Sequence, residues 1–280
     1  MTMKKVTLGT VPFLNSKPLI YPLEQNLIEH NIQVSYFIPS ELSGKLKSRE
    51  VDIALMPVAE LFKNPELKIF PGISISSMGP VDSVVLLSKK SLDEIGSVAL
   101  DKRSRSSSAL IKIILEKFYN ICPQYYYRDI DEGFLADIDS GMLIGNAGLH
   151  AKFYPQQGFT VYDLGQLWTE HTGLPFVYAV FAYHKDNQEK IDSVGKSILE
   201  SKTSGQKYIE EIIKDQAPKL GLTKEICFHY LSKSIRYDLG INEIEGMKKF
   251  GEYLQDYDID IKSTKQELLF ENLNTLQINS

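Results

Sequence analysis

Four predicted strand-to-helix junctions hold the residues best suited to bind a small anion. At each of them an apolar run ends in a turn with backbone N–H groups and small side chains, and a helical pattern follows. Free N–H groups and partial positive charge at a helix N-terminus favour an anion. If these junctions meet in one cleft, they would bind a small acid with more than one charge. They are Asn15-Ser16, Pro57-Val58, Ser106-Ser107-Ser108 and Gly145-Asn146-Ala147.

The first junction lies in the stretch GTVPFLNSKPL, residues 9–19, directly after the apolar run at 6–8. Ser16 can cap the helix that begins here, and Pro18 falls in its first turn, where its missing N–H costs nothing. In an open α/β sheet, ligands bind beyond the carboxyl ends of the strands. Asn15 is therefore a candidate ligand contact, although a simple turn residue would give the same local pattern.

The order of the predicted elements indicates two lobes. Apolar runs alternate with helical patterns through the first third of the chain, which predicts a parallel α/β sheet. Strand-like runs then follow with little helix between them, and a long apolar run at 174–184 is a candidate return crossing. We expect residues 1–84 plus 185–280 to form one lobe and residues 85–184 to form the other. Ligand sites favour the cleft between such lobes.

The remaining chain is predicted from its periodicity. Residues 67–70, 73–76 and 83–88 read as three separate strands, and residues 235–239 as an edge strand. The last hundred residues are otherwise mainly helical in pattern. After residue 258 the pattern weakens, which predicts a less ordered tail.

Composition excludes several classes of protein. The chain has 280 residues, 43% of them apolar, and a net charge of −5, which argues against a nucleic-acid partner. Cys122 and Cys227 have no metal-ligand spacing and are expected to be reduced thiols. No apolar run approaches the ~18 residues of a membrane span. Because no signal-peptide core follows Lys4 and Lys5, we expect a cytoplasmic protein with no membrane partner.

Cofactor motifs are missing from the sequence. It contains neither G-x-x-x-x-G-K nor G-x-G-x-x-G, no G-x-S-x-G, and no H-x-x-x-H pair among its five histidines. We therefore expect no metal and no nucleotide cofactor. An enzyme with this sequence would rely on orientation, hydrogen bonds and the substrate's own groups.

Seven stretches, in order along the chain, carry a resemblance to a known family. They are GTVPFLNSKPL (9–19), VDIALMPVAEL (51–61), GPVDSVVLLS (79–88), SRSSSALIKIIL (104–115), LIGNAGL (143–149), DLGQLWTEHTGLPFVYAVF (163–181) and IRYDLGINEIEGMKKF (235–250). They resemble the chorismate dehydratases of the futalosine route to menaquinone. The resemblance implies a two-lobed α/β fold like the type II periplasmic binding proteins, used in the cytoplasm as an enzyme. It also implies a cofactor-free lyase that converts chorismate to 3-[(1-carboxyvinyl)oxy]benzoate and water.

Catalytic roles follow from the resemblance by matching positions. Asn15 matches the asparagine of the family's first loop, which holds the reacting end of the substrate, and Ser83 matches a serine at the lobe crossing. Our hypothesis is that the enolpyruvyl carboxylate of chorismate takes the ring proton while Asn15 and Ser83 orient the substrate. The rival hypothesis assigns that proton to a protein base, His150 or His171.

Binding roles follow in the same way. Ser106 and Ser107 match the loop–helix pair that receives a carboxylate, and Ser16 and Val58 are expected to contact substrate at the first two junctions, Val58 through its backbone. Asn146 stands where the family usually has Asp. The resemblance therefore implies hydrogen bonding at this position rather than a carboxylate base.

Two other functions remain open from the sequence. One is the sister enzyme of the pathway, 1,4-dihydroxy-6-naphthoate synthase, whose first loop usually reads like C-P-N-D where this chain has V-P-F-L-N. The other is a non-catalytic protein that binds a small acid. The oligomeric state is not indicated by any pattern.

Overall fold

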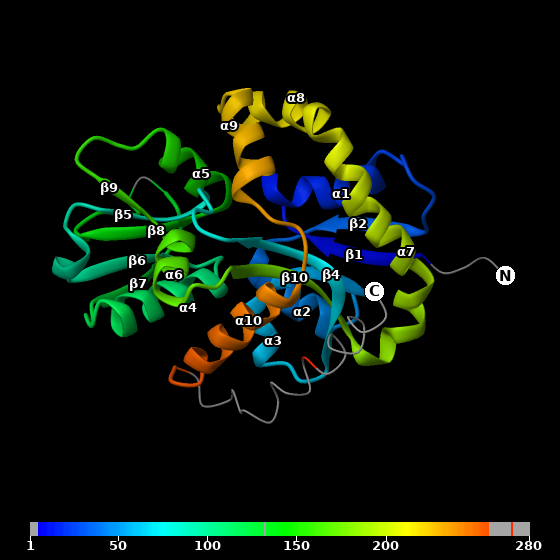
Figure 1. The fold of residues 1–280 in the computed structure, drawn as a ribbon, viewed down its shortest axis with the longest axis horizontal. Helices are drawn as coiled ribbons and strands as arrows, with labels where there is room; N and C mark the ends of the chain where they lie inside the picture. Colours follow the sequence, from blue (N-terminus) through cyan, green and yellow to red (C-terminus); the bar gives the residue numbers. More distant parts are fainter. Residues whose placement is uncertain (1–4, 132, 258–269, 271–280) are drawn as a thin grey trace.

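The structure is a computed structural model that describes residues 5–131, 133–257 and 270. The chain forms two five-stranded sheets that lie side by side, with helices packed around each (Figure 1). The predicted weakening of order after residue 258 concerns residues that, apart from 270, lie outside this description.

The first sheet has the strand order β2-β1-β3-β10-β4. β1 is parallel to both β2 and β3, whereas β10 is antiparallel to β3 and β4. The strands are β1 (Val6–Thr10), β2 (Ile32–Tyr36), β3 (Ile53–Pro57), β4 (Leu67–Ser77) and β10 (Phe176–His184).

The second sheet repeats this arrangement in the order β7-β6-β8-β5-β9. β6 is parallel to β7 and β8, and β5 is antiparallel to β8 and β9. The strands are β5 (Val84–Ser88), β6 (Ser97–Asp101), β7 (Gln124–Arg128), β8 (Ser140–Ile144) and β9 (Thr160–Asp163).

The parallel sheet expected from the first third of the chain is confirmed for β1, β2 and β3, and in each complete sheet one strand runs against the other four. The fourth strand in each order, β10 or β5, begins where the chain arrives from the other sheet, and it therefore enters antiparallel to its neighbours (Figure 1). The predicted strands at 67–70 and 73–76 are one strand, β4, which Gly72 interrupts with φ 77°. Residues 235–239 form no strand, only a bridge between Arg236 and Ser76.

The lobe boundaries at residues 84 and 184 stay a prediction. Strand membership agrees with the first of them, because β5 starts at Val84 in the second sheet. Strand membership places the second crossing, from the second sheet back to the first, earlier than expected, because β10 already belongs to the first sheet. A boundary drawn by strands would therefore fall before Phe176 rather than after His184.

Helices cover both sheets (Figure 1). None of them, within the described part of the chain, is both long enough and apolar enough to cross a membrane. Two π-helical turns, at 114–118 and 230–234, extend α4 and α9. The helices are α1 (Lys17–Glu24), α2 (Leu42–Lys47), α3 (Val58–Phe62), α4 (Ser106–Ile113), α5 (Gly145–Phe153), α6 (Leu164–Thr172), α7 (Gln188–Gly205), α8 (Ile209–Leu220), α9 (Lys224–His229) and α10 (Ile241–Leu254).

An aromatic cluster joins the two sheets beneath the cleft. The fully buried Trp168 of α6 makes edge contacts with Phe176 of β10 and Phe250 of α10, at centroid distances of 5.3 and 6.2 Å. Its indole N–H donates to the carbonyl of Pro175. Large buried rings with satisfied polar atoms contribute strongly to packing. The return crossing is therefore tied to elements of both sheets.

Candidate functional site

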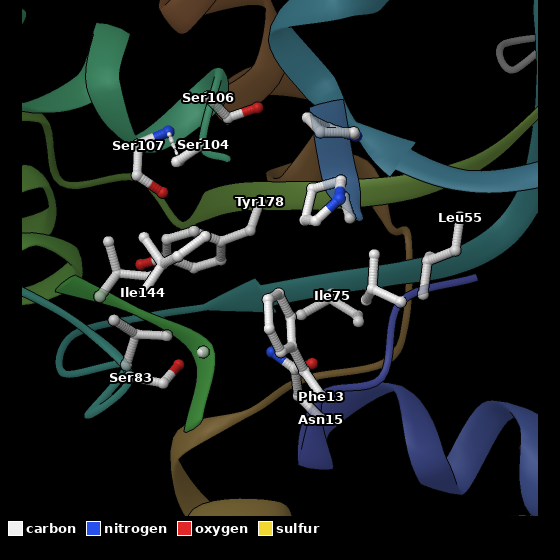
Figure 2. A pocket seen from close by; sticks show the side chains of 17 residues that line it. Phe13, Asn15, Leu55, Ile75, Ser83, Ser104, Ser106, Ser107, Ile144 and Tyr178 are labelled. Atoms are coloured by element: carbon white, nitrogen blue, oxygen red, sulfur yellow. Dashed lines mark hydrogen bonds between the residues drawn. The ribbon is translucent and has the colours of Figure 1, made fainter. Parts of the chain in front are cut away.

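One cavity lies where the carboxyl ends of the central parallel strands of the two sheets meet (Figure 2). Residues that follow β1 and residues at the end of β3 line it from the first sheet, and residues that follow β6 and residues at the end of β8 line it from the second. The space between the lining side chains, including its open mouth, is about 590 Å³. The residues include Phe13, Asn15, Pro57, Ser83, Ser104, Ser106, Ser107, Ile144, Gly145 and Tyr178.

The cavity offers hydrogen bonds without formal charge. Within residues 5–131, 133–257 and 270, no Asp, Glu, His, Lys or Arg lines it. Tyr178 is its one titratable lining residue, and burial raises the pKa of that hydroxyl well above its usual value. The tyrosine therefore stays neutral, and a bound acid would bring the strongest base in the cavity with it.

Asn15 faces this cavity from the 3-10 turn, Leu14–Ser16, that precedes α1 (Figure 2). Its side chain lies close enough to the hydroxyl of Tyr230 to lower the pKa of that hydroxyl. Its Oδ1 is buried and has no partner among the described residues. An unpaired buried acceptor costs about 1–3 kcal/mol. A hydroxyl of a bound ligand would complete this hydrogen bonding.

Ser16 does not cap α1, so that prediction is wrong. Its hydroxyl is turned back to the loop and hydrogen bonds with the carbonyls of Val11 and Phe13 at 2.7 and 2.8 Å. Ser16 is buried and is not among the cavity-lining residues. Its position favours a role in shaping the loop that presents Asn15, and substrate contact by Ser16 stays a prediction.

Ser83 lies at the start of β5, after a loop that Asp163 holds in place. The buried Asp163 carboxylate accepts hydrogen bonds from the backbone N–H groups of Val81 and Asp82 at 2.7 to 3.1 Å. It also caps α6 through the N–H groups of Gly165 and Gln166. Burial raises the pKa of Asp163, while these backbone hydrogen bonds oppose the rise.

The backbone around Ser83 is closely confined. Asp82 has φ 61°, which is rare for a residue other than glycine and marks a strained turn. On the other side, α5 approaches so closely that a Cβ at Gly148 would lie 2.2 Å from the carbonyl oxygen of Ser83. The Ser83 hydroxyl accepts a hydrogen bond from Tyr230 at 2.7 Å. Its position is thus determined by contacts from three elements.

The serine-rich junction lies on the opposite side of the cavity (Figure 2). The Ser104 hydroxyl accepts from the N–H of Ser107 at 3.2 Å, and the Ser108 hydroxyl donates to the carbonyl of Ser104. The Ser106 hydroxyl accepts from the N–H of Ala59 at 3.1 Å. Ser107 is the member whose hydroxyl has no partner in the described part of the chain, and it lines the cavity at the start of α4.

The two remaining junctions contribute bridges across the cleft. Val58 is fully buried at the start of α3, and the N–H of its neighbour Ala59 bonds to Ser106. The Asn146 amide accepts from the N–H of Leu14 at 3.0 Å and donates to the carbonyl of Pro12. Neither Val58 nor Asn146 is among the cavity-lining residues. Substrate contact by these two residues stays a prediction, and their observed contacts join the two sheets.

The two histidines considered as bases lie away from the cavity. His171 stacks on Phe118 at a centroid distance of 4.6 Å, and its Nδ1 contacts the carbonyl of Leu167. His150 is exposed on α5 beside Tyr154. Neither ring is among the lining residues. This geometry favours the hypothesis in which the substrate supplies the base.

Three residues that matter for the site were missed from the sequence. Asp163 precedes a helical pattern and could have been recognised as an N-cap, although not as the residue that holds the Ser83 loop. Tyr178 and Tyr230 belong to apolar patterns that predict core residues. No group of three or more His, Cys, Asp or Glu side chains in the described ranges is arranged to hold a metal ion.

The sequence matches a family model described as "Menaquinone biosynthesis" over residues 6–256. The chain belongs to this menaquinone-biosynthesis family. It is similar to the chorismate dehydratase of Thermus thermophilus, with 30% identity over 90% of this chain and 96% of the relative. The chorismate dehydratase of Campylobacter jejuni is 25% identical over 86% of this chain and 94% of its own length. The resemblance drawn from the seven stretches is confirmed.

Solved structures confirm the fold expected of this menaquinone-biosynthesis family member. The periplasmic aliphatic sulphonate binding protein SsuA from Escherichia coli superposes with a TM-score of 0.68. The match covers 96% of this chain and 92% of that protein, at 16% sequence identity. At that identity the likeness concerns the fold alone. The α/β fold of the periplasmic-binding-protein type is thus confirmed.

Proposed function

We propose that this protein is a chorismate dehydratase, a hydro-lyase of menaquinone biosynthesis. Two nearly full-length relatives bear that name, and the cavity suits a small acid with hydroxyl and carboxylate groups. The proposed reaction converts chorismate to 3-[(1-carboxyvinyl)oxy]benzoate and water. We also propose that it takes place in the cytoplasm on a free small molecule, with neither nucleic acid nor a membrane as partner.

The reaction is an elimination across two neighbouring ring carbons. The carbon that bears the enolpyruvyl ether loses its proton, and the electrons of that C–H bond form the third ring double bond. The neighbouring carbon loses its hydroxyl, which leaves as water after taking up one proton. Because the ring becomes aromatic, the elimination balances without an oxidant, a reductant or a cofactor.

The absence of a charged side chain among the described lining residues carries the mechanistic proposal. Proton removal needs a base, and the enolpyruvyl carboxylate of the substrate is the base best placed to act inside such a cavity. An intramolecular base that is held in the reactive geometry gains about 7–11 kcal/mol from orientation. The carboxylic acid so formed then returns the proton to the departing hydroxyl.

The two sides of the cavity have different tasks in this proposal. Asn15 Oδ1, the unpaired acceptor, receives the hydrogen bond of the substrate hydroxyl. Ser83 donates to the same departing oxygen, since its hydroxyl already accepts from Tyr230. Ser107 and the N–H groups at the start of α4 hold the ring carboxylate, as helix N-termini do for anions.

The direct test is to mix the purified protein with chorismate and follow products by absorbance and chromatography. We expect one equivalent of 3-[(1-carboxyvinyl)oxy]benzoate per chorismate consumed, with no added cofactor. Tight binding of chorismate without turnover would instead support the non-catalytic binding protein. Turnover of a cyclised futalosine, with chorismate untouched, would support the sister enzyme.

The base is tested by His150→Gln and His171→Gln. Because neither ring faces the cavity, we expect kcat of each variant to stay within about threefold of the wild type. A loss of about a thousandfold in either variant, with the fold intact, would assign the proton to that histidine and overturn the substrate-assisted mechanism.

A further inference from the structure

The hydroxyl of Tyr230 joins the two candidate catalytic residues. It donates to Ser83 Oγ at 2.7 Å, and the Asn15 side chain lies close enough to lower the pKa of Tyr230. Tyr230 is 1% exposed and is not among the residues that line the cavity. Its hydroxyl thus stands behind Asn15 and Ser83, on the side away from the ligand space.

A π-helical turn brings Tyr230 to this place. The turn, Tyr230–Ser234, continues α9 in a long C-terminal segment that the resemblance does not link to the site. Ser234 from the same turn hydrogen bonds to the carboxylate of Asp82, next to Ser83. Turns of this kind are frequent at functional sites. One turn thus holds two consecutive residues of the strained loop.

The contacts from Asn15 through Tyr230 to Ser83 have a defined donor-to-acceptor direction. Since Asn15 Oδ1 has no partner among the described residues, the N–H of the amide is the group that reaches Tyr230. Tyr230 gives its own proton to Ser83, and the Ser83 proton remains free to point into the cavity. Among the described residues, this leaves one unpaired acceptor, Asn15 Oδ1, and one available donor, the Ser83 hydroxyl.

We infer that Tyr230 is a positioning residue that sets this polarity and strengthens Ser83 as a donor to the departing hydroxyl. The inference rests on the proposed dehydratase function. Linked hydrogen bonds polarise one another, so a serine hydroxyl that accepts from Tyr230 donates more strongly. Without the tyrosine hydroxyl, Ser83 can turn its proton away from the substrate, and the Asn15 amide can rotate.

Burial suits Tyr230 to this task at any pH in which the enzyme works. It raises the pKa of Tyr230 well above that of an exposed tyrosine, despite the interactions with Ser83 and Asn15 that lower it. The hydroxyl thus remains a donor through neutral and mildly alkaline pH. Tyr230 supplies no proton to the reaction and acts only through its two neighbours.

The test compares Tyr230→Phe with the matched control Tyr237→Phe. Tyr237 is also buried, but its hydroxyl has no partner in the described ranges and it does not line the cavity. For Tyr230→Phe we expect kcat to fall about tenfold or more while KM for chorismate changes less than about threefold. For Tyr237→Phe we expect both constants to stay within about twofold of the wild type.

A double-mutant cycle with Ser83→Ala separates positioning from general destabilisation. If Tyr230 acts in large part through Ser83, Tyr230→Phe lowers kcat by a smaller factor when Ser83 is already alanine than it does in the wild type. Equal losses in both backgrounds would overturn the inference, because they would show that Tyr230 acts independently of Ser83. The thermal midpoint of each variant shows that it is folded at the assay temperature.

The wild-type assay keeps this inference separate from the proposed function. If wild-type protein does not dehydrate chorismate, the dehydratase proposal fails, and the role assigned to Tyr230 in that reaction fails with it. If wild-type protein turns over chorismate and Tyr230→Phe behaves like Tyr237→Phe, only the role assigned to Tyr230 is overturned.

Discussion

The β1–α1 and β6–α4 junctions occupy equivalent places in the two sheets but present different chemistry. Each follows the second strand in its sheet order and faces the same cavity. At the first junction, the Ser16 hydroxyl is satisfied by loop carbonyls, and the group without a partner among the described residues is the Asn15 amide oxygen. At the second, the serines support one another and leave the Ser107 hydroxyl and a helix N-terminus facing the ligand.

This difference teaches how one fold can both hold and transform a ligand. The second junction resembles an ordinary anion site, which a binding protein also needs. At the first junction, Asn15 supplies a fixed acceptor, and Ser83 from the loop before β5 supplies a fixed donor beside it. Both side chains contact Tyr230, and neither is charged. We infer that binding depends chiefly on the serine side and turnover on the side of Asn15 and Ser83.

The largest effect is expected for Asn15→Asp. A carboxylate here would repel the substrate's own carboxylates and would lose the N–H that reaches Tyr230. We expect kcat/KM for chorismate to fall about a hundredfold or more, and about tenfold or more for Asn15→Ala. Steady-state kinetics at pH 8 measures both. Wild-type turnover in either variant would remove Asn15 from the site.

Ser107→Ala tests the role in binding that is assigned to the serine side of the cavity. Because Ser107 is proposed to hold a carboxylate that does not react, KM should rise about tenfold while kcat stays within about threefold. Ser108→Ala is the matched control, since within the described ranges its hydroxyl bonds to the carbonyl of Ser104 alone. A loss in kcat with KM unchanged would place Ser107 among the reacting groups instead.

A smaller effect, on stability, is expected for Gly148→Ala. The added Cβ would lie 2.2 Å from the Ser83 carbonyl oxygen, so α5 or β5 must move. Overpacking of this kind costs about 1–3 kcal/mol. Gly44→Ala is the control, because nothing lies within 4 Å of its added Cβ in α2. Thermal unfolding should show a lower midpoint for the first variant only; equal midpoints would contradict the tight approach.

The smallest effect concerns the pH dependence of stability at Asp163. Since burial raises its folded-state pKa, the folded state binds this proton more tightly than the unfolded state does. Its contribution to folding is therefore greatest below the unfolded pKa, near 4, and is lost as pH rises through the folded pKa.

Urea unfolding of wild type and Asp163→Asn at several pH values tests this sign. We expect the stability of the wild type relative to the variant to decrease as the pH rises above about 4 and then to level off. A relative stability that increases over that range would indicate a carboxylate whose pKa is lowered by folding.

Much of the architecture was predictable, because short strands and helix starts have local signals. The strand-to-helix junctions at Asn15, Ser106 and Asn146 were found at the correct strand ends. The antiparallel strands β5 and β10 were not, because their direction depends on which sheet the chain enters. The hydrogen bonds of Ser16 with loop carbonyls were also missed. A serine before a helix has the same sequence signature whether its hydroxyl caps the helix or bonds to the preceding loop.

Long-range contacts limited the prediction of the site. Ser83 was assigned by resemblance, but its partner Tyr230 lies 147 residues further along the chain in an apolar helical pattern. Substrate contact by Asn146 stays a prediction, and its hydrogen bond with the backbone of Leu14 was not foreseen. Such pairings depend on how the two sheets are placed, which periodicity within a segment does not specify.

Turnover of a chorismate analogue whose enolpyruvyl carboxylate is replaced by a carboxamide tests the central claim most directly. The account predicts that the analogue binds in competition with chorismate and is not dehydrated at a measurable rate, because the base has been removed. Dehydration of the analogue at a rate near that of chorismate would contradict the account and would require a base supplied by the protein.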